Sequence, residues 1–232
     1  DILSNKNPLS GERLTARTVE GRRLYFDATI SAPKSVSIMA LTAGDTRLIE
    51  AHQRAVHFAL SELESQAQTR VRVKGQNTVR KTGNFLYASV MHTTSRANDP
   101  QLHSHNIIFN ATFDQEEQKY KALEAYEIYD KVKFYTEIYR NELAKEVKAL
   151  GYEIERARHG WELSCVPHEM RELFSKRSHT IKDAIREREL LLGRSLSNDE
   201  KALLSERTRV AKSKTLSPDD ALSEQRKQLS PE

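Results

Sequence analysis

The sequence predicts an α+β fold in which helices flank a central antiparallel, palm-like β-sheet, with a protruding β-hairpin and a helical C-terminal region. Three observations predict it. Helical and strand-like segments do not alternate regularly along the chain, which favours antiparallel pairing over a parallel α/β sheet. Residues 69–82 alternate in side-chain character about a turn-forming centre, as a hairpin does. Beyond residue 180 the chain is highly charged, poor in aromatic residues and helical in pattern.

The composition limits the class of protein. The chain has 232 residues, of which 38% are hydrophobic and 30% charged, and this length suits one large domain or two small ones. No apolar run approaches the roughly 20 residues that span a bilayer, and the first residues lack a signal pattern. The single cysteine, Cys165, excludes an internal disulfide and a cysteine-based zinc site. We expect it to be a small packing residue, in a reducing, cytoplasmic setting.

The elements of the first third follow from local signals. Residues 24–30 are β-branched and aromatic, which indicates a strand, and Pro33 ends strand pairing because it has no N–H. A helix is predicted over 33–43, which Gly44 ends, and a second over 46–67, which Asp45 caps. Apolar residues of the second helix recur at helical spacing, and we expect His52 and His57 on its solvent side.

The remaining elements are predicted in the same way. A hairpin is expected from strands 69–74 and 78–82, with its tip at residues 75–77. One strand is predicted over 85–91, ending at His92, and another from His103 to about residue 113. Residues 123–150 form a long, broken helical pattern whose tyrosines we interpret as packing residues. A second hairpin over 152–163 and a helix starting at Pro167 follow.

Three histidines form the first candidate site. His103 and His105 are two residues apart in a predicted strand, so their side chains share one face. His92 ends the preceding strand, and the turn-forming residues 95–100 bring it beside that pair. Three imidazoles on one side of a sheet form a metal site with open coordination positions, the layout of catalytic metals. The alternative is that each is an ordinary surface or core histidine, because a histidine pair at this spacing is a weak motif.

A stretch without acidic residues forms the second candidate site. Residues 65–98 contain no Asp or Glu in a chain that is otherwise rich in both. The stretch carries several cations and therefore indicates a polyanionic partner. On its first strand Arg70, Arg72 and Lys74 are expected to share one face. The alternative is a basic, solvated edge hairpin that resists aggregation.

Two segments resemble a known family. Residues 27–37 read DATISAPKSVS, residues 99–106 read DPQLHSHN, and His92 lies eleven residues before His103. Over roughly residues 20–215 the sequence is similar to the relaxase domain of MobF-type conjugative relaxases, within the HUH endonuclease class. The resemblance implies metal-dependent, site- and strand-specific nicking and rejoining of DNA at a plasmid origin of transfer through a phosphotyrosine intermediate. It places the nucleophilic tyrosine upstream of this chain.

The resemblance also implies roles for residues. His92, His103 and His105 match the family's metal ligands, with Mg, Mn or Zn as the ion. Asp27 matches the catalytic carboxylate that orients a ligating histidine and can take the tyrosine proton. Ser104 stands where the class name implies an apolar residue, but its side chain should point to the opposite face.

The resemblance further implies partners and a domain plan. We expect residues 1–166 to form the metal- and DNA-binding core, and residues 167–232 a helical, fingers-like part of the same domain. The expected partners are origin DNA, as a hairpin and a single strand, accessory conjugation proteins and a C-terminal helicase domain, with no membrane. A two-stranded ribbon fits the major groove. The candidate DNA contacts are Lys34, Arg70, Arg72, Lys74, Gln76, Asn77, Arg80, Lys81, Arg96, Lys176 and Arg177.

Two alternative functions fit part of this pattern. A cupin-like metal enzyme also carries paired histidines on a strand, but it needs a glutamate soon after them. Here no acidic residue follows His105 until Asp114. A non-catalytic DNA-binding fragment that keeps the fold is the second alternative. The complete set of three histidines and Asp27 argues against it.

Overall fold

The computed structural model describes residues 2–15, 20–124, 126, 132–158, 160–208 and 217–228. Packing divides the chain into two compact, non-contiguous units. The sheet unit comprises Asp1–Ala32, Ile49–His92 and His103–Gly151; the helical unit comprises Pro33–Leu48, Thr93–Leu102 and Tyr152–Glu232. These units follow a different division from the one expected after residue 166, which stays a prediction about domain organisation.

The central sheet has the order β1-β5-β4, with β1 at Tyr25–Ser31, β5 at Pro100–Phe109 and β4 at Tyr87–Thr94. Strands β1 and β5 are antiparallel, and Thr29 lies opposite His105. Along β5 the side chains alternate between buried and partly exposed without interruption. His103 and His105 therefore share the outer face, as predicted, while Leu102 and Ser104 share the buried face.

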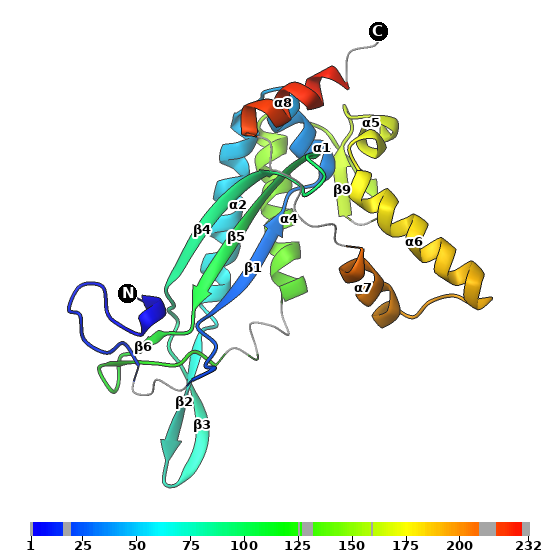
Figure 1. The fold of residues 1–232 in the computed structure, drawn as a ribbon. Helices are drawn as coiled ribbons and strands as arrows, with labels where there is room; N and C mark the ends of the chain where they lie inside the picture. Colours follow the sequence, from blue (N-terminus) through cyan, green and yellow to red (C-terminus); the bar gives the residue numbers. More distant parts are fainter. Residues whose placement is uncertain are drawn as a thin grey trace. The chain divides into compact units, whose positions relative to one another are not determined.

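The hairpin pairs β2 (Gln68–Val73) with β3 (Gln76–Lys81) and projects from the rest of the sheet unit (Figure 1). Its turn is formed by Lys74 and Gly75, both with positive φ, at 49° and 84°. Two successive positive φ angles are what a tight two-residue hairpin turn requires. The predicted tip at 75–77 was therefore wrong, because Gln76 already belongs to β3. Lys74 lies in the turn and does not continue the face of Arg70 and Arg72.

Helices α2 (Arg47–Glu64) and α4 (Val132–Ala149) belong to the sheet unit for most of their length. The apolar stripe of α2 is buried as predicted, and His57 is exposed. The predicted solvent position of His52 was wrong, because its side chain is 0% exposed. Tyr135 and Tyr139 of α4 are buried packing residues, as expected, whereas Tyr126 is 72% exposed, so its expected packing role was wrong. Residues 125 and 127–131 of the predicted broken helix lie outside the described residues.

Two short strands complete the sheet unit. Strand β6 (Thr112–Asp114) pairs with β7 (Lys119–Lys121) in an antiparallel hairpin. The strand predicted to run to about residue 113 is interrupted between Phe109 and Thr112. The amide of Ala111 turns back there to the carbonyl of Phe109 at 2.7 Å.

The helical unit begins with α1 (Lys34–Ser37), which continues as a wider helical turn over Ile38–Thr42. The amide of Ala43 donates to the carbonyl of Ile38, five residues back, at 3.1 Å. The later elements are β8 (Ile154–Ala157), β9 (Gly160–Leu163), α5 (His168–Leu173), α6 (Lys176–Leu192), α7 (Asn198–Arg207) and α8 (Pro218–Lys227).

Cys165 is exposed in a turn, so its expected packing role was wrong. Among the described helices, none is both long and apolar enough to cross a membrane.

Candidate metal centre and nucleic-acid surface

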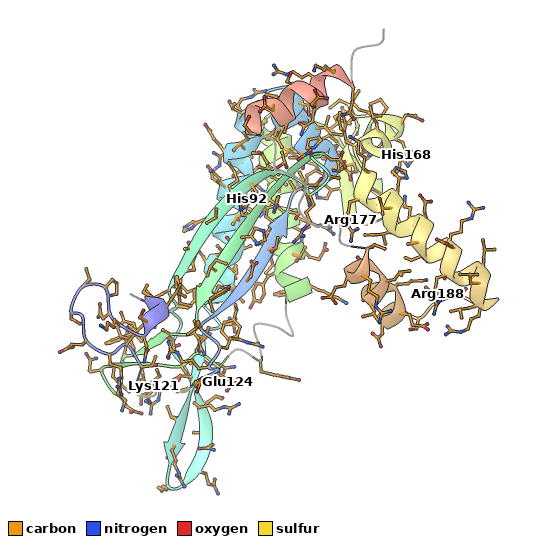
Figure 2. All side chains as sticks on the ribbon, in the orientation of Figure 1. His92, Lys121, Glu124, His168, Arg177 and Arg188 are labelled. Atoms are coloured by element: carbon orange, nitrogen blue, oxygen red, sulfur yellow. The ribbon has the colours of Figure 1, made fainter. Side chains whose placement is uncertain are left out.

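The three predicted histidines meet on the outer face of the sheet. Ring centroids are 5.4 Å apart for His92 and His103, 5.3 Å for His92 and His105, and 5.4 Å for His103 and His105. His92 is exposed on β4, where Figure 2 labels it, and the other two are partly exposed on β5. The nearly equilateral spacing follows from the period of a strand together with the pairing of β4 beside β5.

This spacing suits a metal ion. Because metal–nitrogen bonds are about 2.1 Å long, three imidazoles on one ion hold their ring centres roughly 5 Å apart. As the side chains stand, no set of three or more histidine, cysteine or acidic residues in the described part of the chain is arranged to hold an ion. The rings of His92 and His103 are stacked, with their planes at 25° to each other. His92 is exposed on its strand.

Asp27 contacts the third histidine. Its Oδ2 lies 2.8 Å from Nδ1 of His105, and the two side chains are 38% and 37% exposed. A carboxylate on Nδ1 fixes the tautomer with its proton there and leaves the Nε2 lone pair for a metal ion. The structure thus brings all four residues of the predicted centre together.

Thr29 is a site residue that we missed from the sequence. Its hydroxyl donates to Oδ1 of Asp27 at 3.2 Å and lies 3.1 Å from Nδ1 of His105. Thr29 follows Asp27 by two residues on β1, so the same period-two argument used for the histidines could have found it.

The hairpin presents most of its predicted contacts to solvent. Arg72, Lys74 and Lys81 are exposed, as are Gln76 and Asn77. Arg72 also donates from Nε to the turn carbonyl of Gly75 at 3.2 Å. Arg70 is exposed and forms an ion pair with Glu124.

Arg80 is placed differently from its neighbours. Its side chain is 22% exposed and reaches Asp114 and Glu116, each at 2.9 Å, and Glu117 at 3.5 Å. Lys121 also contacts Asp114 at 2.9 Å. Figure 2 shows Lys121 and Glu124 where the hairpin joins the remainder of the sheet unit. The guanidinium of Arg80 is therefore engaged within the protein.

Asp114 is the buried centre of this network, with a side chain that is 1% exposed. Burial raises the pKa of its carboxyl, but hydrogen bonds from Lys121 and from the backbone amides of Glu117 and Glu116 outweigh burial and hold the pKa at about 2. Asp114 is consequently ionised at neutral pH.

The remaining candidates lie in the helical unit. Lys34 donates to the carbonyl of Pro100 at 3.0 Å, and burial lowers the pKa of its amine against the opposing charges of Asp99 and Glu162. The amide of Lys176 donates to Asp99 at 3.0 Å, and its amine lies 3.5 Å from the same carboxylate.

Arg177 and Arg96 differ in what their side chains contact. Arg177, on α6 (Figure 2), donates to the carbonyls of Thr208 and Ser205, both at 2.5 Å. Arg96 is exposed in the turn before β5. Arg177 is thus occupied by protein acceptors, whereas Arg96 faces solvent.

Solved structures of a conjugative relaxase share this fold. The metal-free complex of the relaxase TrwC with OriT DNA gives a TM-score of 0.88 at 30% identity, covering 98% of this chain and 80% of that one. A copper-bound complex gives a TM-score of 0.88 at 31% identity, covering 98% and 78%. The complex with a 27-mer that comprises the recognition hairpin and the cleavage site gives 0.87 at 31%, covering 98% and 81%.

The sequence comparisons agree with the fold. The model of the TrwC relaxase family matches residues 1–231, and the chain belongs to this family. The multifunctional conjugation protein TraI of Escherichia coli K12 is 41% identical over 184 residues, which are 74% of this chain and 10% of TraI. The chain thus spans about a tenth of the length of the curated relatives it matches. The expected resemblance to MobF-type relaxases and the α+β fold are confirmed.

Proposed function

We propose that this chain is the DNA-nicking and rejoining part of a conjugative relaxase and acts at an origin of transfer. The observation that carries the proposal is the triangle of His92, His103 and His105, with Asp27 on the third ring. Membership of the TrwC family and the fold shared with TrwC–OriT complexes support it.

The residues account for the chemistry. A divalent ion held by the three imidazoles would polarise the non-bridging oxygens of the scissile phosphodiester. Asp27 keeps Nδ1 of His105 protonated and its Nε2 directed away from the carboxylate, and Thr29 holds the other carboxylate oxygen. Because Asp27 is 38% exposed, it can also accept the proton of an attacking hydroxyl. The attacking oxygen then bonds to phosphorus while the 3′ oxygen leaves, and the reverse reaction rejoins the strand.

The donor set restricts the proposed ion. Imidazole ligands suit Zn or Mn better than Mg, which prefers oxygen ligands. Of the three ions expected from the sequence, we therefore favour Zn or Mn. One relative, TrwC, has been solved in a copper-bound form.

For DNA we propose that the hairpin lies in a major groove. Arg72, Lys74 and Lys81 would contact phosphates, with Arg70 at the base, and Gln76 and Asn77 would reach base edges. In the helical unit, Arg96, Lys176 and Lys34 remain proposed phosphate contacts. We assign Arg80 and Arg177 to the interior contacts described above. Accessory proteins, a helicase domain and a cytoplasmic setting stay predictions of the sequence.

The test is cleavage of single-stranded origin DNA by the full-length gene product, with Zn²⁺ or Mn²⁺ supplied. His105→Ala and Asp27→Ala should each abolish cleavage, while binding of the origin hairpin stays within about twofold. Full cleavage by either variant would refute the proposal. Retained cleavage by His57→Phe, an exposed histidine on α2, controls for general damage. The proximity of the three histidines and Asp27 favours this function over a non-catalytic DNA-binding fragment, and the family and fold leave the cupin-like alternative without support.

A further inference from the structure

The buried face of β5 carries polar side chains directly behind the histidines. Ser104 and Asn106 are 2% and 0% exposed, and they alternate with His103 and His105 along the strand. Burying a polar group costs free energy unless the group is hydrogen-bonded. The hydrogen-bond partners of Ser104 and Asn106 therefore show what holds β5 in place.

Ser104 ends a chain of three buried side chains from three different elements. Its hydroxyl lies 2.9 Å from Nε2 of His52 on α2, and Nδ1 of that histidine lies 2.6 Å from the hydroxyl of Tyr139 on α4. The two rings meet edge to face, with centroids 5.4 Å apart. His52 and Tyr139 are both 0% exposed.

This series of hydrogen bonds requires the imidazole of His52 to be neutral. Burial, with a smaller effect from His103, lowers the pKa of His52 to about 4. A neutral imidazole has one N–H donor and one acceptor nitrogen, and the hydroxyls of Ser104 and Tyr139 can each complement either. All three groups are therefore satisfied without a buried charge.

Asn106 ties β5 to both neighbouring strands. Its amide donates to the carbonyl of Ala28 on β1 at 2.8 Å, and its oxygen accepts from the hydroxyl of Ser89 on β4 at 2.8 Å. A one-residue slip of β5 would turn Ser104 and Asn106 outward and force His103 and His105 into the core. These buried hydrogen bonds therefore oppose such a slip.

We propose that Tyr139, His52 and Ser104 are positioning residues that fix the local conformation of residues 103–105 and so direct His103 and His105 toward a common metal ion. The proposal rests on the metal centre of the proposed function. It predicts that the Ser104 hydroxyl matters to the histidines even though it lies on the opposite face of the sheet.

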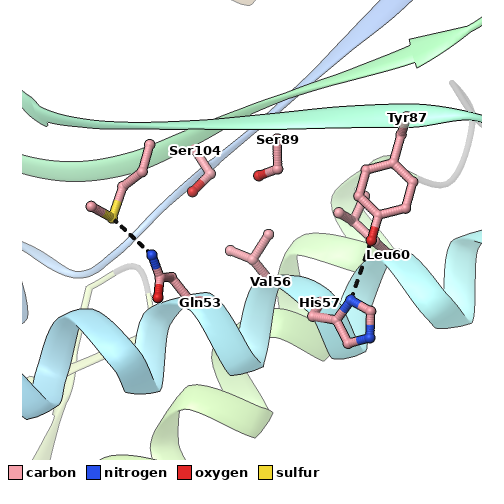
Figure 3. A pocket seen from close by; sticks show the side chains of 8 residues that line it. Gln53, Val56, His57, Leu60, Tyr87, Ser89 and Ser104 are labelled. Atoms are coloured by element: carbon pink, nitrogen blue, oxygen red, sulfur yellow. Dashed lines mark hydrogen bonds between the residues drawn. The ribbon is translucent and has the colours of Figure 1, made fainter.

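The surroundings of Ser104 allow a matched pair of variants. A cavity of about 230 Å³ between α2 and β4 is lined by Ser104 together with Gln53, Val56, His57, Leu60, Tyr87, Ser89 and Met91 (Figure 3). Ser104→Thr and Ser104→Val have nearly the same shape, but only the threonine keeps the hydroxyl.

His57→Phe is the matched control. His57 lies on the same helix, lines the same cavity and bonds a tyrosine hydroxyl, that of Tyr87, at 3.2 Å (Figure 3). It differs from His52 in that this hydrogen bond joins α2 to β4, whereas His52 bonds Ser104 on the strand that carries the histidine pair. Ser104→Val combined with His52→Phe removes both polar partners, so neither is left unpaired if the single variant folds poorly.

Two measurements test the proposal. In the metal-free chain, NMR signals of the His103 and His105 imidazoles should shift or broaden in Ser104→Val and in the double variant, and keep their parent positions in Ser104→Thr and His57→Phe. In calorimetry, Ser104→Val and the double variant should bind Zn²⁺ about 10-fold more weakly than the parent chain. Parent imidazole signals in both Ser104→Val and the folded double variant would overturn the proposal. If the parent chain binds no Zn²⁺, the metal centre fails, and the imidazole signals still decide the positioning role.

Discussion

Nδ1 of His105 lies 2.8 Å from Oδ2 of Asp27 across the β1–β5 pair, although the two residues are 78 positions apart in the chain. The register places Thr29 opposite His105, so Asp27 is the diagonal neighbour of His105 on the same face of the sheet. Both side chains are more than a third exposed, which leaves the pair open to a substrate. A histidine tautomer is thus set by a residue from another strand.

Asp27→Ala should weaken Zn²⁺ or Mn²⁺ binding by about 10- to 100-fold, because the His105 ring loses the group that orients it. Asp27→Asn should cost less, since its amide oxygen can still accept from Nδ1. Thr29→Val should have the smallest effect, because Asp27 keeps its contact with His105. Isothermal calorimetry measures all three, and equal affinities across the series would contradict the assigned role of Asp27.

Arg72→Ala and Lys74→Ala should each weaken binding to an origin hairpin oligonucleotide and reduce its salt dependence. Each lost phosphate contact lowers the slope of log K against log salt concentration by about 0.9. Fluorescence anisotropy at several salt concentrations measures the slope. Lys133→Ala, an exposed lysine on α4, is the control that should leave it unchanged. A parent-like slope in both hairpin variants would argue against the hairpin as the DNA contact.

Arg80→Ala and Lys81→Ala should have opposite effects on stability and on the salt dependence of DNA binding, although the two residues are neighbours. Arg80 bridges carboxylates at the hairpin base, so its loss should lower the free energy of unfolding by about 1–3 kcal/mol without changing the salt slope of DNA binding. Lys81 is exposed, so its loss should reduce the slope and leave stability within about 0.5 kcal/mol. Denaturant unfolding and salt-dependent binding test both, and a reduced slope for Arg80→Ala would return it to the DNA contacts.

Asp114 should make stability depend on pH in the acid range. Its folded-state pKa of about 2 lies below the ordinary value of 3.8, so the carboxylate contributes stability that is fully present above about pH 4. This contribution, about 2 kcal/mol, should be lost as pH falls toward 2. Asp114→Asn should be less stable at pH 7 and should lose less between pH 5 and 3. Denaturant titrations at these pH values measure the difference, and parallel losses in both proteins would contradict the role of Asp114.

Local sequence signals predicted most of the elements and the four residues that lie together in the proposed centre. The alternation around His103 and His105 required a strand with both rings on one face, and the acid-free stretch identified the hairpin. The position of the hairpin turn was wrong by one residue, because Lys74 adopts a positive φ that the sequence pattern did not indicate. His52 was misplaced because a polar residue at a buried helical position is stable only when distant partners satisfy it.

The sequence by itself determined which residues form the proposed metal centre, because strand periodicity and motif spacing are properties of neighbouring residues. Only the tertiary structure decided which partner each of them meets. Asp27 reaches His105 and Ser104 reaches His52 through pairings between distant segments. Arg80, which the sequence offered as a candidate DNA contact, forms an ion pair with Asp114 of a distant segment. Such choices depend on long-range packing and burial, which local sequence patterns do not encode.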